Sequence, residues 1–171
     1  MPPPWAKAIL SFGNFSITPP KIIEQIKSGS KITITDPNMT RFNIIMNQAL
    51  DLIERATNTG KGSEVFVPKL LAYRVGDLKD VLLDLFESKN STEIISVRVG
   101  EKLHESLLTI DELRNTYESK YDYLIIEKSN LHTTPVHDYE KTSLNEQYSS
   151  NNVKLLTKDE LKDILLKEDL I

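Results

Sequence analysis

The stretch GDLKDVLLDLFESKNSTEIISVR, residues 76–98, holds both kinds of secondary structure that decide the fold class. Asp77 suits a helix cap, and apolar residues follow it at helical spacing: Leu78, Val81, Leu82, Leu85 and Phe86. Burying each of these side chains would contribute roughly 1.5–3 kcal/mol, so this helix is expected to lie on a core. Ile94 to Arg98 then predicts a strand. A helix that leads directly into a strand favours an α/β fold.

The same alternation continues toward the N-terminus. Pro19-Pro20 opens a segment of helical spacing that ends at Gly29, and residues 31–35 alternate as a strand with one buried face does. Residues 45–57 predict a helix whose apolar stripe consists of Ala49, Leu50, Ile53 and Ala56. Val65 to Val67 predicts a short strand that ends at Pro68.

Toward the C-terminus, residues 123–126 predict a further strand and residues 128–151 a long polar loop. Two Thr/Glu pairs, Thr109 with Glu112 and Thr157 with Glu160, have the spacing of a capping box. The second pair predicts a terminal helix with a narrow apolar stripe, formed by Leu161, Ile164 and Leu165.

Composition excludes several functional classes. The 171 residues suit one domain, or one domain with a tail, and the absence of cysteine excludes disulfides, thiolate metal sites and a cysteine nucleophile. It also suits a reducing cytoplasm, which is the expected location. A net charge of −4 argues against nucleic acid as a partner. No apolar run approaches the roughly 20 residues of a membrane span, and Met1 to Trp5 lacks the pattern of a secretory signal.

Motifs for dinucleotide and metal chemistry are missing from this sequence. The six glycines, at positions 13, 29, 60, 62, 76 and 100, form no GxGxxG, GxxGxxG or P-loop pattern, and no tyrosine is followed by lysine four residues later. His132 and His137 lie five residues apart in a polar segment without a third ligand, so they predict a surface loop and no metal site. The role of His104 stays open.

Two segments, residues 35–42 and 98–105, carry the most informative chemistry. Each places an arginine, Arg41 or Arg98, just past an apolar strand and before a segment read as helical. Ligands bind at such strand ends in α/β layers, and an arginine fork matches two phosphate oxygens. Glu101 lies three residues after Arg98, where its carboxylate would accept hydrogen bonds from sugar hydroxyls. The alternative is that both arginines pair with surface carboxylates.

Four segments in a fixed order resemble a known family. Residues 36–42 resemble its TDPxMTRF signature, residues 60–67 its GxGGEIFV segment, residues 98–105 its RPGEKLHE motif with Val99 in place of proline, and residues 148–157 its YSSNxN…LT ending. The family is the UDP-N-acetylglucosamine 4,6-dehydratase group of extended short-chain dehydrogenases. Its members make sugars for capsules and surface glycans and are sometimes labelled UDP-glucose 4-epimerases.

The resemblance implies a fold, a domain plan and a set of binding residues. The fold would be the C-terminal substrate-binding lobe of such an enzyme, an α/β lobe with a small sheet and packed helices, without the Rossmann domain. Residues 1–12 would be an atypical N-terminal segment, 13–127 the nucleotide-sugar-binding lobe, and 128–171 a polar loop with a C-terminal helix. Asn14, Arg41 and Arg98 would contact the diphosphate, Glu101 the ribose, and the strand from Thr33 to Thr35 would lie beside the uracil.

The resemblance leaves three hypotheses about function. Complete members use NAD(P), which this chain alone is not expected to bind. The first hypothesis is therefore that the chain is the UDP-sugar-binding part of a dehydratase or epimerase and is inactive alone. It would work with a separate Rossmann-domain chain or as a homo-oligomer. The second is a non-catalytic interaction domain that retains the fold. The third is a small enzyme of unrelated chemistry built on Glu101, His104 and Glu105.

Overall fold

The computed structural model describes residues 18–62, 64–126 and 138–167. These residues divide into two compact units, each assembled from separate stretches of the chain. The first unit contains residues 44–70 and 106–149, and the second contains residues 18–43, 71–105 and 150–167, apart from the gaps just given.

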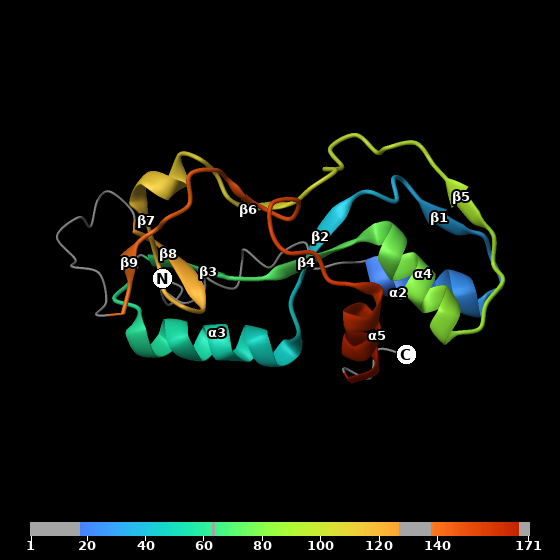
Figure 1. Ribbon diagram of the computed structural model, residues 1–171, viewed down its shortest axis with the longest axis horizontal. Helices are drawn as coiled ribbons and strands as arrows, with labels where there is room; N and C mark the ends of the chain where they lie inside the picture. The colour runs from blue at the N-terminus through green and yellow to red at the C-terminus, as the bar shows by residue number, and fades with distance from the viewer. Residues whose placement is uncertain (1–17, 63, 127–137, 168–171) are drawn as a thin grey trace. The chain divides into compact units, whose positions relative to one another are not determined.

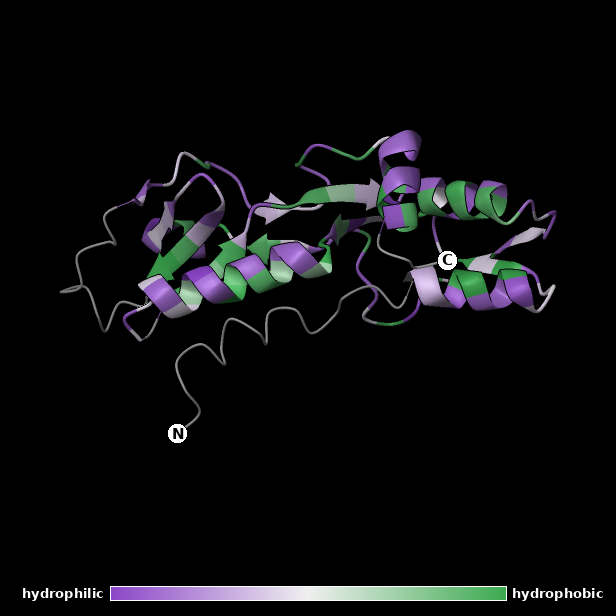
Figure 2. Cartoon of the chain, turned by 90° about the horizontal axis from the view of Figure 1, so that it is seen from below, coloured by the Kyte–Doolittle hydropathy of each residue, from purple (hydrophilic) through white to green (hydrophobic). Residues whose placement is uncertain are grey.

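The first unit is built on a four-stranded antiparallel sheet in the order β3-β8-β7-β9 (Figure 1). Its strands are β3 (Glu64–Pro68), β8 (Asp122–Ile126), β7 (Thr116–Glu118) and β9 (Glu140–Lys141). Helix α3 (Met46–Thr59) packs on the sheet through Leu52 and Ala56, which meet Phe66, Leu124 and Ile126. Figure 2 shows the green and purple stripes of this amphipathic helix. The 3₁₀ helix η1 (Glu112–Asn115) precedes β7, and β6 (Ser106–Leu108) pairs with β10 (Tyr148–Ser149).

The second unit combines two small sheets with three helices. Strands β1 (Ile32–Ile34) and β5 (Thr92–Ile94) pair in parallel, and β2 (Thr40–Asn43) pairs antiparallel with β4 (Leu71–Arg74). The helices are α2 (Thr18–Lys27), α4 (Val75–Leu85) and α5 (Lys158–Lys167). Helix α4 lies in the connection from β1 to β5 because parallel strands need a long crossover.

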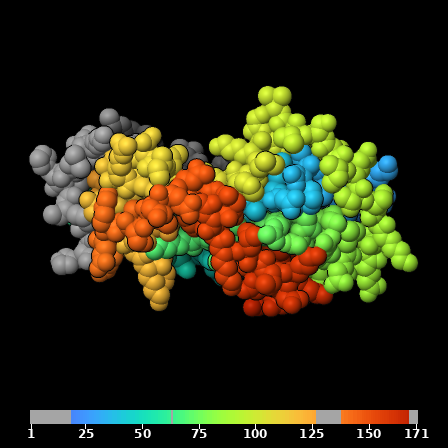
Figure 3. Space-filling view, turned by 45° about the horizontal axis from the view of Figure 1, so that its top comes forward, coloured from blue at the N-terminus to red at the C-terminus, as the bar shows by residue number. Residues whose placement is uncertain are grey.

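The core of the second unit lies between these helices and β1. Its buried side chains are Ile22, Ile26, Ile32, Ile34, Met39, Tyr73, Val75, Leu78, Val81, Leu82, Leu156, Leu161 and Leu165. Helix α5, red in Figure 3, lies against the green α4. Ion pairs join the two helices at their exposed edge, from Lys158 to Asp80 at 2.6 Å and from Lys162 to Asp84 at 2.8 Å. Since exposed pairs contribute little, the buried leucines hold α5 in place.

Most of the predicted elements are confirmed. The helices expected at residues 19–29, 45–57, 76–86 and after Thr157 correspond to α2, α3, α4 and α5, and the strands expected at 31–35, 65–67 and 123–126 correspond to β1, β3 and β8. Both capping boxes form: the backbone N–H of Thr157 donates to Glu160 Oε2 at 2.8 Å, and that of Thr109 to Glu112 Oε2 at 2.8 Å. The box formed by Thr109 and Glu112 precedes only the short 3₁₀ helix η1.

Other predictions were wrong in detail. The strand expected at residues 94–98 is β5, residues 92–94. Leu50, predicted in the buried stripe of α3, is 54% exposed, whereas Leu52 is fully buried, because the buried line runs through Leu52 and Ala56 at i, i+4. Asp77 lies in the first turn of α4 and is not its cap. The described part of the predicted loop contains β9 and β10.

None of the described helices is long and apolar enough to cross a membrane.

Neighbouring leucines in α5 test how this helix is held. Leu165 is 3% exposed in the core, whereas Leu166 is 52% exposed. We expect Leu165→Ala to lower the free energy of unfolding by about 2–5 kcal/mol, because it leaves a cavity. Leu166→Ala, the matched control, should change it by less than about 0.5 kcal/mol. Urea unfolding followed by circular dichroism measures both, and equal losses would show that α5 is not docked in this register.

Candidate functional site

The carboxyl ends of β1 and β5 meet at one edge of the second unit. The backbone N–H of Ile95 continues the pairing by donating to the carbonyl of Ile34 at 2.9 Å. Just past this point, Thr35 Oγ1 donates to the Glu101 carboxylate, 3.2 Å from Oε2 and 3.3 Å from Oε1. Parallel pairing thus brings together two polar side chains that are 66 residues apart, at the kind of edge where ligands bind in α/β layers.

A tight turn at residues 98–101 holds Glu101 in this position. The backbone N–H of Arg98 donates to Glu101 Oε2 at 3.2 Å, and the N–H of Glu101 donates to the Arg98 carbonyl at 3.0 Å. Gly100 has φ +86°, a backbone conformation that residues with a side chain rarely adopt, so this turn needs glycine. Arg98 is exposed, and its guanidinium makes no hydrogen bond or ion pair with the described residues.

Arg41, by contrast, is tied to its surroundings. It lies on β2 with a side chain only 13% exposed. Its Nη1 donates to the carbonyls of Thr40 at 2.8 Å and Leu103 at 3.2 Å, and its Nη2 donates to Met39 Sδ at 3.6 Å. Its Nε lies 3.5 Å from Glu105 Oε1. The alternative that an arginine pairs with a carboxylate is therefore realised at Arg41.

Glu105 serves both Arg41 and the backbone of β2. Its Oε2 accepts from the backbone N–H of Phe42 at 3.3 Å, so the carboxylate takes the place of a neighbouring strand at this edge. Burial raises the pKa of Glu105 above its ordinary value, although the Phe42 N–H, Arg41 and Lys102 each act to lower the pKa. The cost of desolvating the carboxylate exceeds the stabilisation from these partners.

A buried hydroxyl network lies beside this ion pair. Thr40 Oγ1 lies 2.6 Å from Ser150 Oγ and 2.8 Å from His104 Nδ1. Ser150 also accepts from the backbone N–H of Glu105 at 2.9 Å. The side chains of His104 and Ser150 thus connect β2 to the segment that carries Glu105.

The predicted site residues form two groups. Thr35, Arg98 and Glu101 form one hydrogen-bonded group, and Arg41 belongs to the other with Glu105. Thr33 belongs to neither, because its hydroxyl accepts from Gln25 Nε2 at 2.9 Å and its N–H donates to Gln25 Oε1 at 3.2 Å. Asn14, His132 and His137 lie outside the described residues.

The predicted local setting of the two arginines needs correction. Arg41 lies within β2 rather than past a strand, and residues 98–105 lead into β6 rather than into a helix. The short strands β2 and β6 escaped prediction because three or four residues paired at an edge carry little periodic signal.

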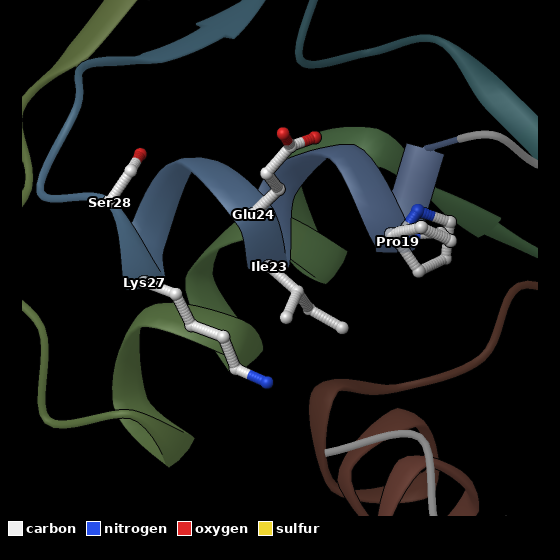
Figure 4. A pocket seen from close by; sticks show the side chains of 6 residues that line it. Pro19, Ile23, Glu24, Lys27 and Ser28 are labelled. Atoms are coloured by element: carbon white, nitrogen blue, oxygen red, sulfur yellow. The ribbon is translucent and has the colours of Figure 1, made fainter.

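A hollow of about 630 Å³ lies along α2. Its lining consists of Pro19, Pro20, Ile23, Glu24, Lys27 and Ser28. Figure 4 shows Ile23 and Lys27 pointing to the same side of the helix. None of the predicted binding residues that the structure describes lines this hollow.

No glycine-rich turn opens a helix in the described part of the chain. Phosphates of NAD(P) bind where a glycine-rich turn opens a helix, because the helix N-terminus attracts anions. Gly60 and Gly62 instead follow the last turn of α3 and lead into β3, at the end of the helix that repels anions. The described part of the chain also contains no cluster of three or more metal-ligating side chains.

Sequence reasoning assigned no role to Thr40 or Ser150 and left that of His104 open. Their signal was present, since Thr40 lies in the segment that resembles TDPxMTRF and Ser150 in the segment that resembles YSSN. Only the fold shows that these motifs meet, through the 2.6 Å contact between the two hydroxyls.

The raised pKa of Glu105 predicts a pH dependence of stability. The folded state holds the Glu105 proton more tightly than the unfolded state, so the stability that this proton confers is full below the ordinary pKa of 4.5 and is lost as pH rises through the higher folded value. Glu105→Gln cannot ionise there. We expect the stability of the variant to improve relative to wild type as pH rises.

Urea unfolding of both proteins from about pH 4 to about pH 7 measures this difference. Glu54→Gln, which removes an exposed carboxylate from α3, is the control and should show no such trend. A constant difference between wild type and Glu105→Gln over this range would contradict the prediction.

The chain is similar to known proteins of one family. The model of a family described as "Polysaccharide biosynthesis protein" matches residues 11–127. UDP-glucose 4-epimerases from Rickettsia massiliae (strain Mtu5) and Rickettsia conorii (strain ATCC VR-613 / Malish 7) are each 36% identical over 155 residues, which cover 89% of this chain and 46% of the relative.

A solved structure, the X-ray structure of Pen from Bacillus thuringiensis, superposes with a TM-score of 0.80 at 29% identity, covering 93% of this chain and 47% of that one. The chain thus spans about half the length of the relatives that it matches. Its α/β fold is that of the corresponding part of Pen. The match to the family model shows that the chain belongs to the polysaccharide biosynthesis protein family of extended short-chain dehydrogenases.

Proposed function

We propose that this chain provides the nucleotide-sugar side of an NAD(P)-dependent 4,6-dehydratase or epimerase that makes sugars for surface polysaccharides. The ligand would be a UDP-sugar similar to UDP-N-acetylglucosamine. Family membership supports a role in polysaccharide biosynthesis, and relatives named UDP-glucose 4-epimerase support a UDP-sugar as the ligand class. The reducing cytoplasm expected from the cysteine-free sequence would be the place of this activity.

The observation that carries the proposal is the turn at residues 98–101. It presents an exposed guanidinium at Arg98 and a carboxylate at Glu101, which Thr35 and the turn itself hold in place. A guanidinium matches the paired oxygens of a diphosphate, and a carboxylate accepts hydrogen bonds from the two ribose hydroxyls. These complementary groups lie at the strand edge where ligands bind in related folds.

Arg41 would act as the second cation. Both N–H groups of Nη1 are used by backbone carbonyls, so Arg41 would contribute its charge and the remaining N–H of Nη2. The hydroxyl of Thr33 already accepts a hydrogen bond from Gln25. Thr33 would therefore contribute only as part of the strand that lies beside the uracil. Asn14 remains a prediction from the family resemblance as a diphosphate contact.

We further propose that these 171 residues do not catalyse the reaction alone. The sequence contains no glycine-rich dinucleotide motif and no Tyr/Lys pair, and Gly60 and Gly62 follow a helix rather than open one. Hydride transfer would then need a Rossmann-domain chain or another part of the same protein. The alternative to a separate partner chain is that this chain assembles as a homo-oligomer.

Titration with UDP tests ligand binding. We expect wild type to bind UDP with a dissociation constant on the order of millimolar or tighter, and Arg98→Ala to bind about ten to a hundred times more weakly, because a hydrogen bond to a charged group is lost. Isothermal titration calorimetry at low salt measures both, since salt screens an exposed charge.

The matched control for this titration is Arg114→Ala, which removes a guanidinium that is 78% exposed in the other unit and should leave UDP affinity unchanged. No binding by wild type would favour the alternative, a non-catalytic interaction domain that retains the fold. Equal losses in both variants would point to unspecific attraction between UDP and positive charge.

A turnover assay tests the need for a partner. We expect the purified 171-residue polypeptide to produce no 4-keto-6-deoxy sugar from UDP-N-acetylglucosamine with NAD or NADP, because the residues for hydride transfer are not present. Chromatography of the nucleotide sugars measures the product. Formation of either a dehydrated or an epimerised sugar by this polypeptide would refute the claim that it is inactive alone.

A further inference from the structure

Ser150 is fully buried and joins two segments of the second unit. Its N–H donates to the carbonyl of Glu105 at 2.8 Å, and its Oγ accepts from the Glu105 N–H at 2.9 Å. The same Oγ donates to the carbonyl of Thr40 at 3.1 Å and lies 2.6 Å from Thr40 Oγ1. One side chain therefore connects strand β2 to the segment of residues 103–105.

These two segments are also the ones that position Arg41. Arg41 follows Thr40 on β2, and its guanidinium reaches across to the Leu103 carbonyl and the Glu105 carboxylate. The backbone adds one more link, because the N–H of Thr40 donates to the Leu103 carbonyl at 3.1 Å. The direction of the guanidinium thus depends on the spacing between β2 and residues 103–105.

We propose that Ser150 is a positioning residue for Arg41, and that its hydroxyl sets the orientation in which Arg41 meets an anionic ligand. The importance of that orientation for binding rests on the proposed function. If the hydroxyl is removed, the N–H of Glu105 loses this acceptor and the carbonyl of Thr40 keeps only Arg41 Nη1 as its donor among the described residues, so we expect the two segments to shift. A guanidinium that bonds to both segments moves with them.

The first test observes Arg41 directly and needs no ligand. In an NMR spectrum of the arginine Nε–Hε groups of the full chain, Ser150→Ala should shift the Arg41 signal and speed its exchange with water several-fold. Arg41→Lys identifies the signal by its loss. Arg55, which pairs with Asp122 at 2.8 Å in the other unit, is the internal control and should not change.

The second test asks whether Ser150 acts through Arg41. Ser150→Ala should weaken UDP binding about tenfold, as expected for disturbing one charge-assisted hydrogen bond. In an Arg41→Ala background the same change should cause no further loss, because effects that pass through one group are not additive. In an Arg98→Ala background the loss should remain. A purely structural role would reduce affinity equally in both backgrounds.

Each result gives a decision. An unchanged Arg41 signal in folded Ser150→Ala overturns the proposal, whatever happens with UDP. A shifted Arg41 signal in a protein that does not bind UDP supports the positioning role and refutes the proposed function instead. If Ser150→Ala does not fold, Ser150→Cys replaces the hydroxyl by a similar but weakly hydrogen-bonding thiol, and the same Arg41 signal decides.

Discussion

Parallel pairing of β1 with β5 creates the edge on which the candidate site depends. Ile32 and Ile34 fill the core side of β1, whereas β5 has exposed side chains and is held by its backbone hydrogen bonds. Because both strands run the same way, Thr35 and the turn that carries Arg98 leave the sheet at the same edge. Parallel strands cannot be joined by a tight turn, and helix α4 is the last element of the long connection that leads to β5.

The two arginines have different environments, and this changes how each would meet a ligand. Arg98 is exposed on a glycine-dependent turn, so its guanidinium is accessible to phosphate oxygens. Arg41 is nearly buried, and Glu105 balances its charge at the cost of desolvating the carboxylate. Such an ion pair is weak evidence for stability, and its position beside Thr40 and Ser150 is the basis of the positioning role that we propose.

Prediction from sequence succeeded where periodicity was strong and failed where elements were short. The helices α2, α3, α4 and α5 follow from apolar spacing, caps and glycine stops, because these signals are local. In α3 the buried Ala56 was predicted correctly, but Leu50 was assigned to the stripe in place of Leu52, since the two are equally apolar and only the sheet decides which one faces it. Strands β2 and β6 are three or four residues long and gain their pairing partners only in the folded chain.

The sequence by itself determined the family, the helices and which residue types carry chemistry, because motifs and periodicity are properties of neighbouring residues. Tertiary structure alone decided which of those residues meet. It placed Thr35 against Glu101, paired Arg41 with Glu105, and joined Ser150 to Thr40 across 110 positions of the chain. The reason is physical: a hydrogen bond or an ion pair depends on distances of about 3 Å between atoms, and separation along the sequence does not fix those distances.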